Sequence, residues 1–243
     1  AFVTNPTNLH FKTIQELAGK TTHMFIEKPI FDHGEYKISD LKLNANGVYY
    51  VAGPLRYSGV IQRLKKILSE EKIFCIRAIC SSYLPDWRPD TDYRLNYSAR
   101  KDQGGGVAID LIHEWDYLSY LFGFPQAVYC MKGKYSHLEI DSEDIAVYIA
   151  AYNDKVVELH LDYFGRTPRR EIEIFTDKGT ITGDLIRNAI SFTDDRQQIL
   201  LEEDKNDIYL NEMRFFMDQI SRNQSFNNME YCYSVLNIAL GKV

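Results

Sequence analysis

The chain of 243 residues lacks several features that define whole classes of protein. Its longest apolar runs, such as residues 235–240, are short and broken by polar residues, whereas a transmembrane helix needs about 18 apolar residues. Cysteine is scarce, with four residues and no CxxC pair, which is too few to staple a chain of this length. These absences argue against a membrane protein and favour a cytoplasmic protein held together by its own core.

An excess of positive charge is also missing. Lys and Arg number 28 and Asp and Glu 34, so the net charge is −6, and no block of like charges forms a tail. Nucleic acid is therefore not expected as a partner. Phosphate-binding motifs are lacking too, because the glycine triplet at residues 104–106 does not fit GxGxxG and the sequence has no Walker loop. The GxSxG turn that carries the nucleophilic serine of many hydrolases is also absent.

The order of apolar runs predicts parallel α/β structure in the first 57 residues. Strand-like runs rich in β-branched and aromatic residues alternate with helical patterns, and Gly19 ends the first helix. The expected strands cover residues 1–4, 23–26 and 47–52, and the expected helices cover residues 8–19 and 38–43.

Strand patterns dominate the remainder of the chain. Apolar and polar residues alternate over residues 156–164, with Glu158, His160 and Asp162 on the polar side, which predicts a sheet with one wet face. The other strands are expected at residues 73–82, 127–131, 145–152, 171–176 and 180–182, and helices at 60–68, 104–122, 208–221 and 230–240. Residues 83–100 form a long polar and aromatic loop, and long loops in compact domains are usually functional.

The predicted fold class is α/β plus α+β. A partial Rossmann domain with a parallel sheet is expected at residues 1–57. A second domain, with an open, mainly antiparallel sheet and helices on one face, is expected at residues 58–228. The C-terminal helix, about residues 229–243, is expected to pack back on the first domain. Residues 145–152 are apolar on both alternations, which predicts a homodimer or homotetramer that buries one sheet face.

Three segments concentrate reactive groups, and the first is Glu27-Lys28-Pro29. It follows a predicted strand, and ligands bind at the carboxyl ends of strands in open α/β sheets. An ammonium there can hydrogen-bond a substrate hydroxyl and serve in its proton transfer. The structural alternative is an exposed pair of charged residues before a proline that starts a loop.

The second segment is the helix expected at residues 104–122. Asp110, His113, Glu114 and Tyr117 fall on one face of such a helix. A carboxylate beside a histidine can fix its tautomer and tune its pKa for general base catalysis. A solvated acidic stripe is the alternative. A metal site is disfavoured because HExxH is absent and no cysteine joins the group.

The third segment is the loop at residues 83–100. It places aromatic rings beside arginines, and this combination suits a polyhydroxylated or anionic ligand because guanidinium groups bind oxyanions bidentately. A packing loop pinned by its own aromatic side chains is the alternative. The candidates in this loop include Trp87, Arg88, Tyr93, Arg94 and Tyr97.

Taken together, these motifs resemble the family of glucose-fructose oxidoreductase, inositol dehydrogenase and MocA (Gfo/Idh/MocA). The resemblance covers nearly the whole chain, and its pieces occur in that family's order. They are Val3-Thr4-Asn5-Pro6 with His10, Gly19-Lys20 before Phe25 to Pro29, Val51 to Tyr57, the glycine triplet with Asp110 and His113, and Leu121-Phe122-Gly123. The run from Tyr83 to Pro89 resembles a bacterial branch associated with surface-polysaccharide metabolism.

The resemblance implies an enzyme that uses NAD or NADP to oxidise or reduce a hydroxyl or keto group of a sugar, sugar derivative or cyclitol. It implies no metal and a cis peptide bond between Lys28 and Pro29. The implied catalytic residues are Lys28, Asp110 and His113. The implied cofactor contacts are Thr4, Asn5, Pro6, His10, Glu27, Lys28 and Arg56. The assigned substrate contacts are Tyr83, Trp87, Arg88, Tyr93, Arg94, Tyr97 and Tyr163.

One departure from the family pattern is large. The first strands of the Rossmann domain and their glycine-rich turn have no counterpart in the sequence. The chain by itself is therefore expected to be inactive and to bind NADH with a dissociation constant above about 10 μM, which a calorimetric titration measures. The rival hypothesis is a non-catalytic binding or oligomerisation module of the same fold that lacks the cofactor site.

Overall fold

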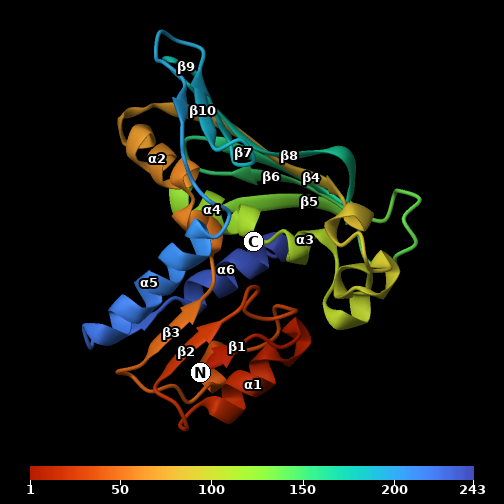
Figure 1. The fold of residues 1–243 in the computed structure, drawn as a ribbon, viewed down its shortest axis with the longest axis vertical. Coiled ribbons are helices and arrows are strands. Elements are labelled where there is room, and N and C mark those ends of the chain that lie inside the picture. The colour runs from red at the N-terminus through yellow and green to blue at the C-terminus, as the bar shows by residue number, and fades with distance from the viewer.

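The computed structural model describes residues 1–243 and contains two β-sheets (Figure 1). The smaller sheet has the strand order β1-β2-β3-β12, and all of its pairs are parallel. The larger sheet has the order β11-β10-β9-β8-β4-β7-β6-β5, and only its β4–β7 pair is parallel. This arrangement confirms the predicted fold class.

The smaller sheet is built from both ends of the chain. Its core side chains include Phe25 and Tyr50, which pack against Phe216 of helix α5. Helix α6 contacts both β3 and helix α4, so it links the smaller sheet to the rest of the molecule. The elements are β1 Phe2–Val3, α1 His10–Leu17, β2 His23–Ile26, β3 Val48–Val51, α5 Asp207–Ser221, β12 Phe226–Asn227 and α6 Met229–Leu240.

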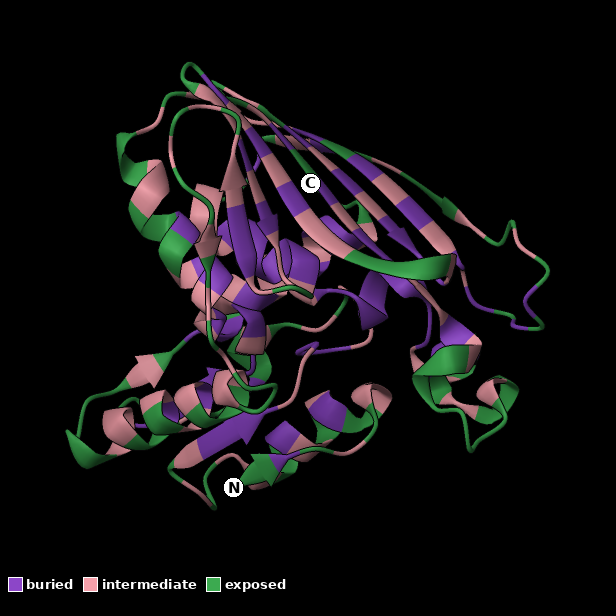
Figure 2. Cartoon of the chain, turned by 45° about the horizontal axis from the view of Figure 1, so that its top comes forward, coloured by how far each residue is buried: buried purple, intermediate pink, exposed green.

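The larger sheet has buried and more exposed residues in alternation along its strands (Figure 2). Its elements are β4 Ile73–Tyr83, β5 Ala127–Gly133, β6 Ile145–Ala151, β7 Val156–Asp162, β8 Phe164–Thr176, β9 Gly179–Asp184, β10 Ala189–Phe192 and β11 Ile199–Leu200, with helices α2 Gly59–Ile67, α3 Val107–Asp110 and α4 His113–Phe122. Asp162 departs from the predicted wet face and is buried, because its carboxylate accepts hydrogen bonds from the backbone N–H groups of Phe164 and Gly165.

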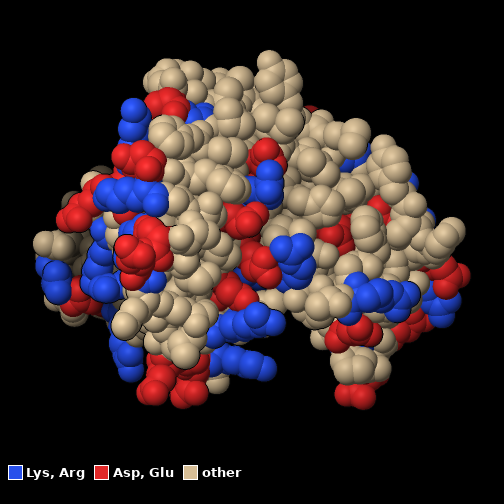
Figure 3. Space-filling view, turned by 90° about the horizontal axis from the view of Figure 1, so that it is seen from above, with Lys and Arg blue, Asp and Glu red and all other residues tan.

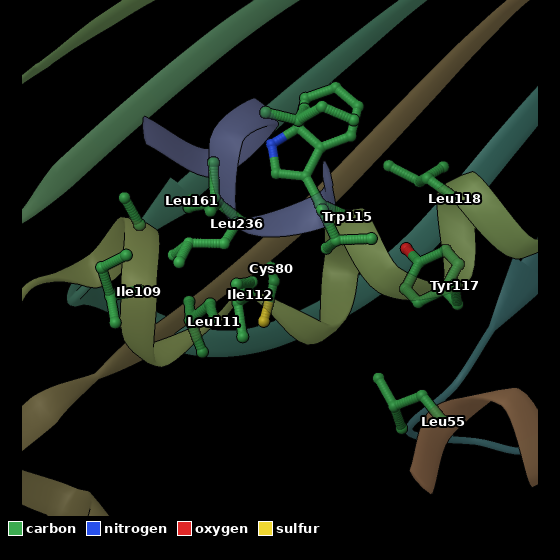
Figure 4. Close-up of a cluster of buried hydrophobic side chains, with 14 of the residues drawn as sticks. Leu55, Cys80, Ile109, Leu111, Ile112, Trp115, Tyr117, Leu118, Leu161 and Leu236 are labelled. Atoms are coloured by element: carbon green, nitrogen blue, oxygen red, sulfur yellow. The ribbon is translucent and has the colours of Figure 1, made fainter. Parts of the chain in front are cut away.

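The prediction of a single helix at residues 104–122 is wrong. Helix α3 ends at Asp110 and α4 begins at His113, and between them Leu111 has a non-helical backbone with φ −94° and ψ 25°. Figure 4 shows the core side chains of this region, with Ile109 on α3, Leu111 in the break and Trp115 on α4. Residues four apart on one helix share a face. The break allows Asp110 and Glu114 to face different partners.

Other sequence expectations need smaller corrections. The helix expected at residues 38–43 is only a 3-10 turn over Ile38–Asp40, because Leu41 adopts extended backbone and is buried in the core. The short strands β10, β11 and β12 were not predicted. All four cysteines are free, and no helix in the structure is both long and apolar enough to cross a membrane.

Candidate active site

Two neighbouring cavities, each of about 350 Å³, share part of their walls. The first, the strand-end cavity, lies where β1 and β2 end and is lined by residues such as Thr4 and Glu27. The second, the arginine-lined cavity, includes Arg170 of β8 and Trp87 of the long loop. The residues that line both cavities are Lys28, Tyr97 and Asp110.

Lys28 lies at the boundary between the two cavities. Its ammonium Nζ donates a hydrogen bond of 3.0 Å to the backbone carbonyl of Asp110, which fixes the end of the side chain. Burial lowers the pKa of Lys28, and the negative charges of Asp110 and Glu27 offset only part of this effect. The group therefore releases a proton more readily than an exposed lysine. The Lys28–Pro29 peptide bond is cis, as predicted.

The carboxylate of Asp110 is held by three hydroxyl groups. Oδ1 accepts from Tyr97 at 2.6 Å, and Oδ2 accepts from Ser98 at 2.5 Å and from Tyr163 at 2.9 Å. Burial raises the pKa of Tyr163, and the charge of Asp110 adds to this effect, so the Tyr163 hydroxyl stays protonated as a donor. These bonds connect α3 to the long loop and to the junction between β7 and β8.

His113 lines the arginine-lined cavity, but its ring makes no hydrogen bond to Asp110. The Asp110 oxygens are occupied by hydroxyl groups, and Nδ1 of His113 is buried without a protein partner. Burial lowers the pKa of His113 well below its usual value, and the nearby charges of Lys28 and Arg170 lower it further. The ring is therefore neutral near pH 7 and is a weaker base than an exposed histidine. The expected pairing of a carboxylate with this histidine does not form.

Glu114 and Tyr117 were predicted on the same face as Asp110, but they line neither cavity. The helix break turns them into the core, where Glu114 is fully buried. Oε1 of Glu114 lies 2.9 Å from Nε of Arg170, which does line the arginine-lined cavity. Sequence reasoning missed Arg170, because it belongs to no motif and its partner lies far away along the chain.

The predicted cofactor contacts gather around the strand-end cavity. Its lining includes Thr4, Asn5, Pro6, His10, Glu27 and Lys28. The ring of His10 bridges two backbone carbonyls, those of Asn5 at 2.9 Å and Pro29 at 3.0 Å, and so ties the ends of β1 and β2 together. Arg56 lines neither cavity, because its guanidinium binds the carboxylate of Asp116.

The predicted substrate contacts separate into two groups. Trp87 and Tyr97 line the arginine-lined cavity, and Tyr163 meets the Trp87 ring edge to face at 5.4 Å. The predicted contacts that do not line this cavity are Tyr83, Arg88, Tyr93, Arg94 and Tyr163. Arg94 pairs with Asp92 at 2.8 Å and Glu139 at 3.1 Å. The structure contains no group of three or more His, Cys, Asp or Glu side chains that could hold a metal ion.

Residues 61–182 match the family model described as the GFO/IDH/MocA C-terminal domain, which is half of the chain. The chain belongs to the Gfo/Idh/MocA family. The matched part of this family member contains Tyr97, Asp110, His113 and Arg170, whereas Lys28 lies outside it. No curated protein sequence matches the chain.

Solved structures share the fold of this Gfo/Idh/MocA chain. A levoglucosan dehydrogenase in complex with NADH superposes with a TM-score of 0.83 at 19% identity, over 99% of this chain and 75% of that chain. The UDP-N-acetylglucosamine 3-dehydrogenase GnnA from Acidithiobacillus ferrooxidans has a TM-score of 0.78 at 21% identity, over 99% and 76%. An oxidoreductase from Agrobacterium radiobacter in complex with NAD+, L-tartaric acid and magnesium has a TM-score of 0.79 at 15% identity, over 98% and 75%.

Proposed function

We propose that this protein is an oxidoreductase that uses NAD or NADP to oxidise a hydroxyl group or reduce a keto group of a sugar, sugar derivative or cyclitol. The observation that carries the proposal is the position of Lys28, Tyr97 and Asp110 in the wall between two cavities. Both volumes fall in the range of small-molecule sites. A proton-transfer group at such a boundary can serve a substrate on one side while a cofactor occupies the other.

The strand-end cavity suits a nicotinamide. It lies at the carboxyl ends of parallel strands, where dinucleotides bind in this class of sheet. The side-chain oxygen Oδ1 of Asn5 is buried there without a protein partner, while its Nδ2 donates to Thr13 at 2.8 Å. An unpaired buried acceptor is costly, and a carboxamide N–H is a suitable donor to it. Thr4, Asn5, Pro6 and Glu27 would hold the ring, and NAD(H)-bound structures share the fold.

The side chains of the arginine-lined cavity supply the proton chemistry. A nicotinamide cofactor, when bound, accepts or returns the hydride. In the oxidation direction the substrate hydroxyl loses its proton to the neutral amine of Lys28, and burial, which lowers the pKa of Lys28, favours this amine over the ammonium. His113 lines the same cavity, and its neutral ring can accept a hydrogen bond from the substrate hydroxyl. Asp110 positions the Lys28 ammonium through its backbone carbonyl and the Tyr97 hydroxyl through its carboxylate.

An absorbance assay tests the proposed function. The protein as its gene encodes it is incubated with NAD+ or NADP+ and a panel of sugars, sugar acids and cyclitols. We expect at least one compound to produce reduced cofactor absorbing at 340 nm. A variant of the site, Tyr97→Phe, is assayed beside the unmodified protein. It removes one of the three hydroxyl donors to Asp110 and is expected to slow the reaction. A protein that binds neither cofactor nor any member of the panel would instead support the non-catalytic module.

We also propose a metabolic role and a cellular location for the protein. The run from Tyr83 to Pro89 supports a role in bacterial surface-polysaccharide metabolism, which implies a cytoplasmic enzyme with a small-molecule sugar substrate. Trp87 in this run lines the cavity, where its ring can pack on the apolar face of a sugar.

The outer face of the larger sheet is expected to be an interface between copies of the chain. Tyr129, Met131 and Ile149 are 72, 62 and 52% exposed, and Tyr129 lies directly opposite Ile149 on the neighbouring strand. Figure 3 shows broad areas of the surface seen from above without charged residues. Apolar patches of this kind mark interfaces. We therefore expect light scattering at micromolar concentration to show a homodimer or homotetramer.

A charged pair of substitutions should disrupt this assembly. The double variant Tyr129→Lys with Ile149→Lys is expected to be monomeric, because assembly would bury two unpaired ammonium groups. Leu210→Lys on α5, where Leu210 is 50% exposed, is the control and should leave the assembly intact. A monomeric unmodified protein would contradict the prediction.

A further inference from the structure

Arg170 has one acidic partner in the protein, and its terminal Nη groups have none. Its Nε lies 2.9 Å from Oε1 of Glu114, but no N–H of Arg170 makes a hydrogen bond of normal geometry to any protein group. Of its side-chain nitrogens only Nε is buried without a partner, so the two terminal Nη groups remain accessible. Arg170 lines the arginine-lined cavity together with Lys28 and His113.

The position of this guanidinium is set by the core. Arg170 lies on β8 directly opposite Cys80 of β4, in the middle of the larger sheet. Glu114, which is fully buried, lies behind it and provides the only nearby counter-charge. Burial lowers the pKa of Arg170, but Glu114, Cys80 and Tyr117 together outweigh this effect, so the pKa is raised and the guanidinium stays charged. The guanidinium is therefore a fixed, charged fork with its terminal donors toward the cavity.

The other charges of the cavity do not neutralise this fork. Asp110 is the one acidic residue in the lining, and its carboxylate already accepts three hydroxyl donors. Arg169 also lines the cavity, but it is paired with Glu171 at 2.7 Å. The cavity thus has an excess of positive charge, and the donors of Arg170 are free for a ligand. A planar guanidinium with free terminal donors matches a carboxylate or phosphate group.

We infer that the substrate is a sugar that carries an oxyanion, a carboxylate or a phosphate, and that Arg170 binds this group and selects for it. The inference rests on the proposed function, because it places the oxyanion in the cavity that also contains Lys28. A neutral sugar would leave the Arg170 donors facing a cavity without a charged partner. An anionic sugar satisfies them and brings its ring hydroxyls into the cavity that Lys28 also lines.

Binding of matched probes without cofactor tests the inference. Calorimetry compares glucose, galactose and mannose with their uronates and their 6-phosphates. We expect at least one uronate or 6-phosphate to bind at least 10-fold more tightly than its neutral parent, and higher salt to reduce this ratio. Uronate preference identifies a carboxylate, and 6-phosphate preference identifies a phosphate. Equal or tighter binding of every neutral parent overturns the inference, as does the absence of binding by every charged probe at 10 mM.

Substitutions at Arg170 separate ligand binding from a structural role. Arg170→Gln should reduce the affinity for the charged probe by about 10-fold or more and leave the neutral parent within about twofold. Because this change leaves Glu114 buried and unpaired, the double variant Arg170→Gln with Glu114→Gln and the charge-preserving Arg170→Lys are measured beside it. Arg166→Gln, an exposed arginine on the same strand, is the control. If the variants lose affinity equally for the charged and the neutral probes, the inference is overturned.

The proposed function can fail independently of this inference. Charge preference in the binding experiment without any cofactor reduction in the 340 nm assay would reject the dehydrogenase and retain the oxyanion site. Cofactor reduction by neutral sugars, with no preference for their charged counterparts, would retain the dehydrogenase and reject the role of Arg170.

Discussion

Replacing Lys28 by methionine is expected to lower kcat for sugar oxidation by about 100-fold or more, which is the scale of a lost acid–base group. Methionine retains most of the apolar stem but has no proton to exchange and no donor for the Asp110 carbonyl, to which Nζ donates at 3.0 Å. Steady-state kinetics on the protein as its gene encodes it measure the effect. KM for the cofactor should change far less than kcat, because the lost interaction serves proton transfer.

A matched control shows whether the loss of activity comes from removing the proton-transfer group or from removing any positive charge. Lys12→Met on α1 removes an exposed ammonium that pairs weakly with Glu16 and lines neither cavity, so activity should remain unchanged. Activity of the Lys28→Met protein within threefold of the unmodified protein would reject Lys28 as the proton-transfer group. His113, the neutral base in the same cavity, would then be the next residue to substitute.

Replacing Arg56 by methionine is expected to lower the free energy of unfolding by about 3 to 5 kcal/mol, as is usual when one partner of a buried ion pair is removed. Nε of Arg56 donates to Oδ2 of Asp116 at 2.7 Å, and Nη2 contacts Oδ1. The two side chains are only 12 and 8% exposed. The variant leaves the Asp116 carboxylate buried without its counter-charge. Urea denaturation followed by fluorescence measures the change in midpoint.

Two further variants show whether the lower free energy of unfolding of Arg56→Met comes from the unpaired charge of Asp116. The double variant Arg56→Met with Asp116→Leu should be clearly more stable than Arg56→Met alone, because no buried charge then remains. The control Arg187→Met removes an exposed arginine that pairs with Asp184, and surface pairs of this kind contribute about 0 to 1 kcal/mol. Equal destabilisation by Arg56→Met and Arg187→Met would contradict a stabilising role for the buried pair.

Local sequence patterns predicted most of the longer elements and the residues at strand ends. Lys28 directly follows β2, and its neighbours in the strand-end cavity belong to short motifs after β1 and β2. The carboxyl ends of neighbouring parallel strands meet at one edge of a sheet, so such motifs come together whatever the rest of the chain does. The same reasoning failed for Arg56, because a local motif does not indicate whether a charged side chain already has a buried partner.

The break between α3 and α4 could not be predicted from periodicity. The run from Gly104 to Phe122 has a continuous helical pattern, yet Asp110 bonds to Tyr97, Ser98 and Tyr163 from other segments while Glu114 lies against Arg170. These hydrogen bonds and this ion pair together outweigh the small free energy by which helix propensity favours one more helical turn. Short strands such as β12 escaped prediction for a related reason, since two residues carry too little pattern to be recognised.

The amino-acid sequence by itself determined the family resemblance, the two-sheet fold class and the identity of Lys28, Asp110 and His113 as candidates for the chemistry, because these depend on local pattern and on motif order along the chain. Only the tertiary structure decided that Lys28 lies between two cavities, that Asp110 is held by hydroxyl groups and not by His113, and that Arg170 lines the same cavity as Lys28. These features depend on the pairing of β4 with β8 and on the helix break. Contacts between segments far apart in the chain arise from packing and burial of the whole core, and short stretches of sequence do not encode them.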